Sequence, residues 1–531
     1  MTTLQTEVLV IGSGFGAAAP ALRLARAGFR VLMVEKGPAI NPQRDFRQTQ
    51  DPQYLLRYIK SIGGDNINFT YAEGLGGGSG FYEMVSLRAP TPAFDQTGPN
   101  GIRLWPAGLS RTALDPYYEI AERMMHVTQI PREEIPRNGV AFSILMKRLG
   151  YSVDRVPYSV QGCVGHSYCV AGCAAGAKVT LHNTYLAPAC RFGMKIMTDL
   201  HALEVRPAAG NQTQAAAGRD IHIIPYRYEV RCLDRAKGVS VGIQAKIVIL
   251  GAGTVGTAGL LLRSRRCLPE LSPHLGKNIS MNGTVKSLGI LPDDVPGGDM
   301  FQGRSHPGVI SYEFLSTRGI TISTSKPLPV DAVSYGNLVM DGETRSPSWW
   351  GDAKVELMKL YRRRAIVLYA LGLTTSTADL HPGRKGEVIP SFHLDEEFRR
   401  YYHQTLDLLH SIVRRNGGRV VHIRMIDGQG VEYPDLHITT AHMTGSCRMA
   451  DSAKNGVVDA TGEVFHYPGL YITDGAAIPS SLAVNPYLTI LANAERVGAF
   501  LAQWHTRREH VRLRTPSPSH LIGASHGSTG Q

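Results

Sequence analysis

The chain has 531 residues, of which 43% are hydrophobic and 19% are charged. This composition excludes a wholly disordered chain, and the length allows several average domains or two large interleaved ones. The formal net charge is +12, to which an arginine-rich tail after Thr506 contributes. We interpret the excess as a solvated basic surface, because no nucleic-acid motif accompanies it.

The cysteine count and the apolar runs indicate the cellular location that we expect for the chain. An odd number of cysteines, seven, in a chain of this length does not indicate a disulfide scaffold. The N-terminus, MTTLQTE, lacks the basic and apolar regions of a signal peptide. No apolar run reaches the about 20 residues of a membrane helix, and the longest, at 365–373, predicts a buried strand. We therefore expect a cytoplasmic protein without a transmembrane segment.

The first 40 residues predict a strand, a helix and a second strand. EVLVIGSG and FRVLMVEKG have the apolar pattern of strands, and the helix between them is expected over about 17–27. Further helices are expected over 112–126, 139–149, 396–415 and 488–505, and strands within 194–250 and 285–393. Tyr117, Ile120, Ala121 and Met124 form the predicted apolar stripe of the second helix, and Asp395 is the predicted N-cap of the fourth.

The turn after the first strand has the pattern of a dinucleotide-binding site. GSGFGA, residues 12–17, reads as G-x-G-x-x-A, in which small residues permit a tight turn and close approach of a pyrophosphate to a helix N-terminus. Glu35 ends the second strand, where an acid accepts hydrogen bonds from a ribose hydroxyl. A second cluster, Gly251, Gly253 and Gly256, lacks such an acid, and we interpret it as a turn that closes the same domain.

Eight segments along most of the chain have distinctive motifs: GSGFGAAAPALRLARAGFRVLMVEKG at the start, GLGGGS at 74–79, WPAGLSRTALDPYYEIAERMM at 105–125, CVAGCAAGAKVT at 169–180, GAGTVGTAGLLLRS at 251–264, HMTGSCRM at 442–449, LYITDGAAIPSS at 470–481 and NPYLTI at 485–490. Together and in this order they resemble the glucose–methanol–choline (GMC) oxidoreductases, particularly the bacterial branch that includes cholesterol oxidase. The resemblance is weakest over 285–435.

The resemblance implies an α/β fold with a Rossmann-like FAD-binding domain made of discontinuous segments and an α+β substrate domain. We expect residues 1–100, 190–284 and 436–505 in the first, 101–189 and 285–435 in substrate-binding or cap regions, and 506–531 as a disordered basic tail. It also implies oxidation of an alcohol, with hydride transfer to the flavin and electrons passing to O2 or another acceptor. His442 stands at the position of the catalytic base, and Asn485 at that of its partner, which holds the substrate hydroxyl. His437, five residues upstream, is not the expected base.

The resemblance further implies a set of cofactor contacts. They are Gly12, Gly14, Phe15, Gly16, Glu35, Gly76, Gly77, Gly78, Ser79, Val205, Asp474, Gly475, Asn485, Pro486 and Tyr487. Asp474 also has the sequence context of an Asx-turn, and the two roles are compatible. FAD is expected to be non-covalent, because no histidine or cysteine stands in a recognisable linkage context.

The substrate is left open by the sequence. A bulky secondary alcohol such as a sterol is one candidate, and a sugar or aminosugar hydroxyl is the other. Tyr82 stands where many family members have an asparagine, which weakens the sterol interpretation, and Glu83 is a possible active-site acid only by proximity. A redox-neutral FAD-containing lyase is the alternative of another class.

One cysteine cluster has a superficial likeness to a metal site. Cys163, Cys169 and Cys173 have a spacing that fits neither a zinc pair nor an iron–sulfur run, so we expect structural loop cysteines and no metal.

Overall fold

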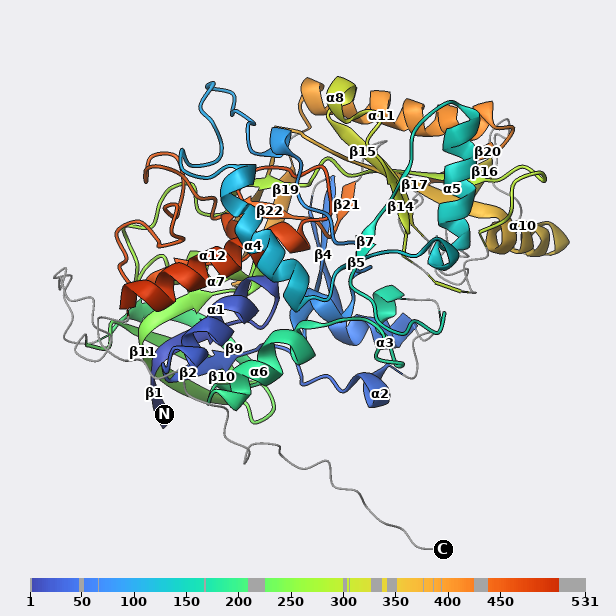
Figure 1. The fold of residues 1–531 in the computed structure, drawn as a ribbon. Coiled ribbons are helices and arrows are strands. Elements are labelled where there is room, and N and C mark those ends of the chain that lie inside the picture. The colour runs from blue at the N-terminus through green and yellow to red at the C-terminus, as the bar shows by residue number, and fades with distance from the viewer. Residues whose placement is uncertain are drawn as a thin grey trace, which may run out of the picture.

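The computed structural model describes residues 2–46, 52–64, 66–166, 169–208, 225–298, 303–304, 306–325, 337–340, 351–375, 377–384, 386–392, 394–424 and 438–505. Two seven-stranded sheets, each with its own helices, form the two halves of the molecule (Figure 1). His437 and the tail 506–531 lie outside the described residues.

The first sheet assembles strands from distant parts of the chain. Its order is β8 (Lys195–Met197), β2 (Val31–Val34), β1 (Thr2–Ile11), β11 (Val239–Leu250), β10 (Tyr228–Asp234) and β9 (Leu200–Pro207), and β23 (Leu470–Ile472) also pairs with β11. The pairs among β8, β2, β1, β11 and β23 are parallel, whereas β10 runs antiparallel to its neighbours. Ile11, Leu250 and Ile472 are aligned, so the carboxyl ends of these strands meet at one edge.

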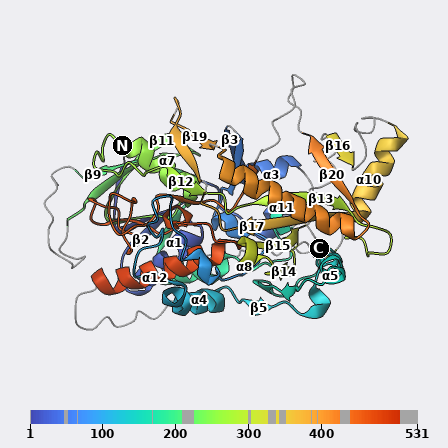
Figure 2. The ribbon, with the colours of Figure 1, turned by 90° about the horizontal axis from the view of Figure 1, so that it is seen from above.

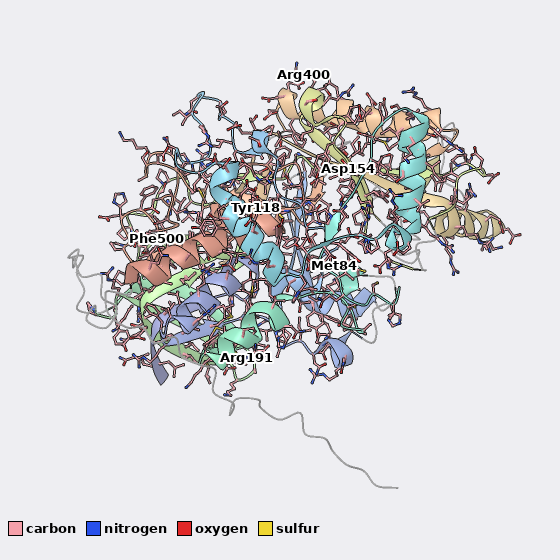
Figure 3. The ribbon with its side chains drawn as sticks, in the orientation of Figure 1. Met84, Tyr118, Asp154, Arg191, Arg400 and Phe500 are labelled. Carbon is pink, nitrogen blue, oxygen red and sulfur yellow. The ribbon has the colours of Figure 1, made fainter. Side chains whose placement is uncertain are left out.

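Helices from both ends of the chain pack beside this sheet. They are α1 (Phe15–Arg26), α4 (Arg111–Met124), α6 (Ala187–Arg191), α7 (Gly253–Ser264) and α12 (Tyr487–His505). Tyr118, labelled on α4 in Figure 3, shares a hydrogen bond of 2.7 Å with the Thr489 hydroxyl of α12. The predicted apolar stripe of α4 is partly wrong: Leu114, Tyr118 and Ala121 are the buried positions, because α12 covers that side.

The second sheet is antiparallel and is covered on both faces. Its order is β16 (Asn337–Met340), β20 (Arg419–Arg424), β13 (Val285–Ile290), β17 (Ala365–Gly372), β15 (Ile320–Ser325), β14 (Val309–Ser311) and β6 (Asp154–Arg155). α5 (Arg137–Arg148) and α11 (Glu396–Arg415) cover one face, and α10 (Asp352–Arg364) packs on the other. Figure 2 shows α11 lying across the strands. The buried strand predicted at 365–373 is confirmed as β17, and the Asp395 cap is confirmed by its hydrogen bond from the Phe398 amide.

Smaller sheets connect the two halves. One contains β19 (Val388–Phe392), β18 (Thr377–Pro382), β12 (Lys277–Ser280) and β22 (Thr444–Ser446); another contains β21 (Ile438–Thr440), β4 (Ile67–Ala72) and β3 (Ile59–Gly64); β5 (Thr128–Gln129) pairs with β7 (Pro157–Tyr158). The remaining short helices are α2 (Pro42–Asp45), α3 (Pro52–Tyr58) and α8 (Leu315–Arg318). The α/β fold is thus confirmed, while the domain boundaries given above stay a prediction.

Two expectations about the environment can be compared with the structure. All seven cysteines are free. Within the described ranges, no helix has both the length and the apolar character that crossing a membrane requires.

Candidate active site

A cavity of about 1010 Å³ lies at the carboxyl ends of the parallel strands and extends to the second sheet. Ligand sites in open α/β sheets occur at this edge, where neighbouring strands connect in opposite directions. Most residues predicted to contact the cofactor or substrate line the cavity: Gly12, Gly14, Phe15, Gly16, Glu35, Gly77, Gly78, His442, Asp474, Gly475, Asn485, Pro486 and Tyr487. Gly76, Ser79 and Val205 do not line it.

The glycine turn at one end of the cavity is shaped by close backbone contacts. Gly12 has φ +95°, and a Cβ there would lie 2.4 Å from the Gly251 carbonyl oxygen. This contact confirms that the second glycine cluster closes the same sheet, because β11 runs beside β1. A Cβ on Gly14, in contrast, would meet no atom within 4 Å. Gly14 therefore leaves room for a ligand at the N-terminus of α1.

The start of α1 is prepared for an anion. Its N-cap, Gly14, provides no side-chain hydrogen bond, and the first turn contains no acidic residue. The first amide groups of a helix have no partner within the helix, and the helix dipole favours negative charge there. These features fit a pyrophosphate.

Glu35 is held at the end of β2 with its carboxylate toward the same cavity. The Ser13 hydroxyl donates to Oε2 over 2.6 Å, and the Gly37 amide donates to Oε1 over 2.8 Å. Burial raises the pKa of Glu35, and these two hydrogen bonds oppose the rise. A carboxylate fixed in this way retains acceptor capacity for a ribose hydroxyl.

Asp474 joins two turns that face the cavity. Its carboxylate accepts hydrogen bonds from the Gly253 amide, the Thr257 hydroxyl and the Ala476 amide, over 2.8, 2.6 and 2.9 Å. The bond from Ala476 is the predicted Asx-turn, and the bond from Gly253 occupies the N-terminus of α7. Burial raises the pKa of Asp474 to about 6. The Gly253 amide at the start of α7 is thus bound by a protein carboxylate.

The predicted residues away from the cavity have structural contacts. The Ser79 hydroxyl donates to the Gly76 carbonyl over 2.7 Å and accepts from the Leu181 amide over 3.2 Å. The Val205 amide donates to the Ser264 hydroxyl over 2.9 Å, and its side chain is buried. Through these contacts, Ser79 stabilises the glycine turn and Val205 stabilises β9.

His442 and Asn485 meet at the other end of the cavity. Asn485 Nδ2 lies 3.3 Å from His442 Nε2, although the residues come from different segments of the chain. The His442 amide donates to the Thr440 hydroxyl over 3.1 Å, which fixes the turn after β21. Burial, together with the positive charge of Lys286, lowers the pKa of His442 to about 4. The imidazole is therefore neutral at ordinary pH and able to accept a proton.

Three aromatic rings lie between the glycine turn and this pair. The Phe15 and Tyr487 ring centroids are 4.7 Å apart, and Tyr82 is 5.0 Å from Tyr487 and 5.5 Å from Phe15. The Tyr82 hydroxyl donates to the Val179 carbonyl over 2.6 Å. Tyr82, which replaces the asparagine of the motif, is thus anchored to the 169–180 loop with its ring at the cavity wall.

Lys286 and Tyr369 are cavity residues that the sequence did not reveal. They lie opposite each other on β13 and β17, and both line the cavity near His442. Burial raises the pKa of Tyr369, and hydrogen bonding to the Ser323 and Asn485 side chains opposes the rise. The sequence pattern of a strand predicts which residues share one face of the sheet, but it does not predict which of the two faces lines the cavity. Glu83 also lines the cavity.

The cysteine cluster surrounds a separate, smaller cavity. Cys163, Cys169 and Cys173 line about 60 Å³ together with His166 and Arg304. Within the described ranges, no group of His, Cys, Asp and Glu side chains is arranged to hold a metal ion.

Comparisons with known proteins identify the family. GMC oxidoreductase family models match residues 6–282 and 379–494. Paromamine 6'-oxidase from Streptomyces fradiae is 27% identical, with 92% of this chain and 90% of the relative covered. Cholesterol oxidase from Mycobacterium tuberculosis is 25% identical, with 95% and 92% covered.

Solved structures support the same assignment at the level of the fold. Pyridoxine 4-oxidase from Mesorbium loti superimposes with a TM-score of 0.66 at 17% identity, with 95% of this chain and all of that chain covered. The family consists of FAD-binding enzymes that act on alcohols, and the matched models span more than half of the sequence. The chain belongs to the GMC oxidoreductase family and is an oxidoreductase of the class that acts on CH–OH groups.

Proposed function

We propose that this protein oxidises the CH–OH group of a substrate to a carbonyl, with His442 as the base. The observation that carries the proposal is the 3.3 Å approach of Asn485 to His442 Nε2 in the cavity that also contains the glycine turn and Glu35. Bound FAD supplies the hydride acceptor for such a reaction. The electrons then leave to O2 or another acceptor.

His442 takes the hydroxyl proton at Nε2. A general base must be unprotonated and within hydrogen-bonding reach of the proton that it removes. The lowered pKa of His442 ensures the neutral state. Asn485 Nδ2 donates to the substrate oxygen and so holds the hydroxyl beside the imidazole.

FAD would be held by the residues that line the cavity from the glycine turn to Tyr487. The open space at Gly14 and the free amides of α1 suit the pyrophosphate, and Glu35 suits the ribose. Within the described residues, no cysteine lines this cavity, which supports non-covalent binding. His201, the other histidine at its wall, lies in β9, near the Glu35 end.

The cavity wall near His442 supports a hydrophilic substrate of the sugar type over a sterol. Thr284, Lys286, Ser325 and Tyr369 of the second sheet line it. A sterol would cover the Lys286 ammonium without supplying a partner, at a cost of at least about 1–3 kcal/mol, whereas the Thr284 hydroxyl already donates to the Met281 carbonyl over 2.9 Å. The similarity to paromamine 6'-oxidase supports the same choice.

The test is an anaerobic visible spectrum of the purified protein with and without a panel of sugars, aminosugars, sterols and simple alcohols. We expect an oxidised flavin spectrum that bleaches with members of the sugar group. A flavin that no alcohol bleaches would contradict the proposed reaction, and bleaching by sterols alone would contradict the proposed substrate class.

A further inference from the structure

The second sheet presents one charged side chain to the cavity beside His442. β13 is buried at every position except Lys286. Lys286 pairs with Tyr369 of β17 in register, and both side chains line the cavity. Thr284, which precedes β13, and Leu371, two residues beyond Tyr369 in β17, line it too, so this end of the sheet forms the substrate wall.

Lys286 is exposed to solvent at the wall of this cavity. Its side chain has an exposed surface, yet burial lowers its pKa, because the solvent that reaches it fills a cavity within the protein. In the part of the chain that the structure describes, Lys286 makes no hydrogen bond and no ion pair. An ammonium group in such surroundings is costly without a partner, so its position indicates that a ligand supplies one.

One carboxylate, Glu83, lines the cavity with Lys286. Glu83 acts electrostatically on both Lys286 and Lys178. Lys178 also has partners of its own, because its ammonium donates to the carbonyl oxygens of Gly80, over 3.0 Å, and Cys169. Lys286 therefore shares one carboxylate with Lys178 and, among the described residues, has no hydrogen bond that holds its ammonium.

We propose that Lys286 binds an oxyanion carried by the substrate, a carboxylate or a phosphate, beside the hydroxyl that His442 and Asn485 hold. The inference rests on the proposed alcohol oxidation and adds a charge requirement to it. A neutral sugar would only partly satisfy the ammonium, and an aminosugar would place a second cation against it. An anionic sugar, such as a uronate or a sugar phosphate, satisfies both the ammonium and the hydroxyl-rich wall.

The experiment uses the FAD-loaded enzyme and three variants. Lys286→Met removes the charge and retains the length, Lys286→Arg retains the charge, and Lys277→Met changes an exposed lysine of β12 away from the cavity. Inorganic phosphate is titrated while the flavin absorbance is recorded. Anaerobic flavin reduction is then compared for glucose, glucuronate, glucose 6-phosphate and glucosamine.

We expect phosphate to perturb the flavin spectrum of the unchanged enzyme and of the Lys277→Met and Lys286→Arg variants. Phosphate should bind the Lys286→Met variant at least about tenfold more weakly, since a charge-assisted hydrogen bond is lost. The anionic sugars should have the lower KM, and this preference should disappear in Lys286→Met but persist in Lys277→Met.

Three outcomes would overturn the inference. One is equal phosphate affinity in the unchanged enzyme and Lys286→Met, and another is a preference for glucose or glucosamine over the anionic sugars. The third is an equal loss of FAD affinity and of activity with all four sugars in Lys286→Met, which would assign Lys286 to the cofactor. Flavin that no alcohol reduces, with phosphate binding still dependent on Lys286, would instead refute the proposed reaction and leave the oxyanion site supported.

Discussion

At the scale of single residues, the site depends on the protonation of His442. Burial and the charge of Lys286 both disfavour the imidazolium, and they lower its pKa to about 4. An ordinary histidine has a pKa of about 6.5. The environment of His442 therefore extends to lower pH the range in which the imidazole is unprotonated.

The acid limb of the pH profile follows from this shift. With a neutral alcohol as substrate, kcat/KM should stay level as the pH falls to about 5 and should drop only near the His442 pKa of about 4. Lys286→Met removes one of the two causes, so the limb should move to higher pH but remain below about 6.5, because burial persists. Glu83 and Lys178 are the same in the unchanged enzyme and in the Lys286→Met variant, so the difference between the two profiles reports the charge at position 286. A limb at 6.5 in the unchanged enzyme, or one that Lys286→Met leaves in place, would contradict this account.

The pairing of His442 with Asn485 was predictable from the sequence, and the residues around the two were not. HMTGSCRM and NPYLTI indicate His442 and Asn485 because their motifs are local. Lys286 and Tyr369 reach the cavity through the register of two antiparallel strands 83 positions apart (369 minus 286), which no local pattern determines. Val205, predicted to contact the cofactor, has a buried side chain, and its role stays a prediction.

At the scale of elements, the turn between β1 and α1 separates a structural glycine from a ligand-facing one. Gly12 has a positive φ and a backbone contact that forbids a side chain. Gly14 has φ −76°, which any residue adopts, and open space where a Cβ would lie. The two positions allow folding and cofactor binding to be examined separately.

Gly14→Ala should fold normally and bind FAD more weakly. The added methyl group meets no protein atom but occupies the space through which a pyrophosphate approaches α1. The measurement is the FAD dissociation constant, with Tm of the FAD-free protein as the check on folding. Gly108→Ala, which also faces open space, is the matched control. Equal FAD affinity in both variants would show that the pyrophosphate does not lie at Gly14.

The cap of α11 provides a prediction about stability alone. Asp395 Oδ1 accepts a hydrogen bond of 2.7 Å from the Phe398 amide, and α11 covers the second sheet. Asp395→Ala should lower the free energy of unfolding by about 1 kcal/mol, as is typical for a lost N-cap. Asp395→Asn should retain most of the stability, because asparagine caps helices equally well. Chemical denaturation of the three proteins would show no difference if the cap contributes nothing.

Elements with strong local patterns were predicted well, and those decided by packing were not. The 396–415 helix has both a cap and an amphipathic stripe, and its bounds are confirmed. On α4 the predicted stripe is displaced, because α12, from the far end of the chain, decides which side is covered. The pairing of β1 with β11 likewise joins residues about 240 positions apart, beyond the reach of local patterns.

At the scale of the whole molecule, one cavity joins the two large sheets. Its wall includes Gly12 and Glu35 from the first sheet and Lys286 and Tyr369 from the second. A ligand that fills it contacts both halves at once. FAD at one hundred times its Kd should stabilise the folded state by about 2.7 kcal/mol. In thermal unfolding experiments, Tm should rise as the FAD concentration increases, and the protein should unfold in a single transition. A Tm that does not change with the FAD concentration would contradict the assigned cofactor site.

The most direct test of the central claim is the rate at which substrate reduces the bound flavin in the absence of O2. His442→Gln should retain FAD and reduce it about 10²–10⁴-fold more slowly, as expected for the loss of a general base. His381→Gln, at an exposed position of β18, should match the unchanged enzyme. If His442→Gln binds FAD and reduces it at the unchanged rate, His442 is not the base, and the account of this site is wrong.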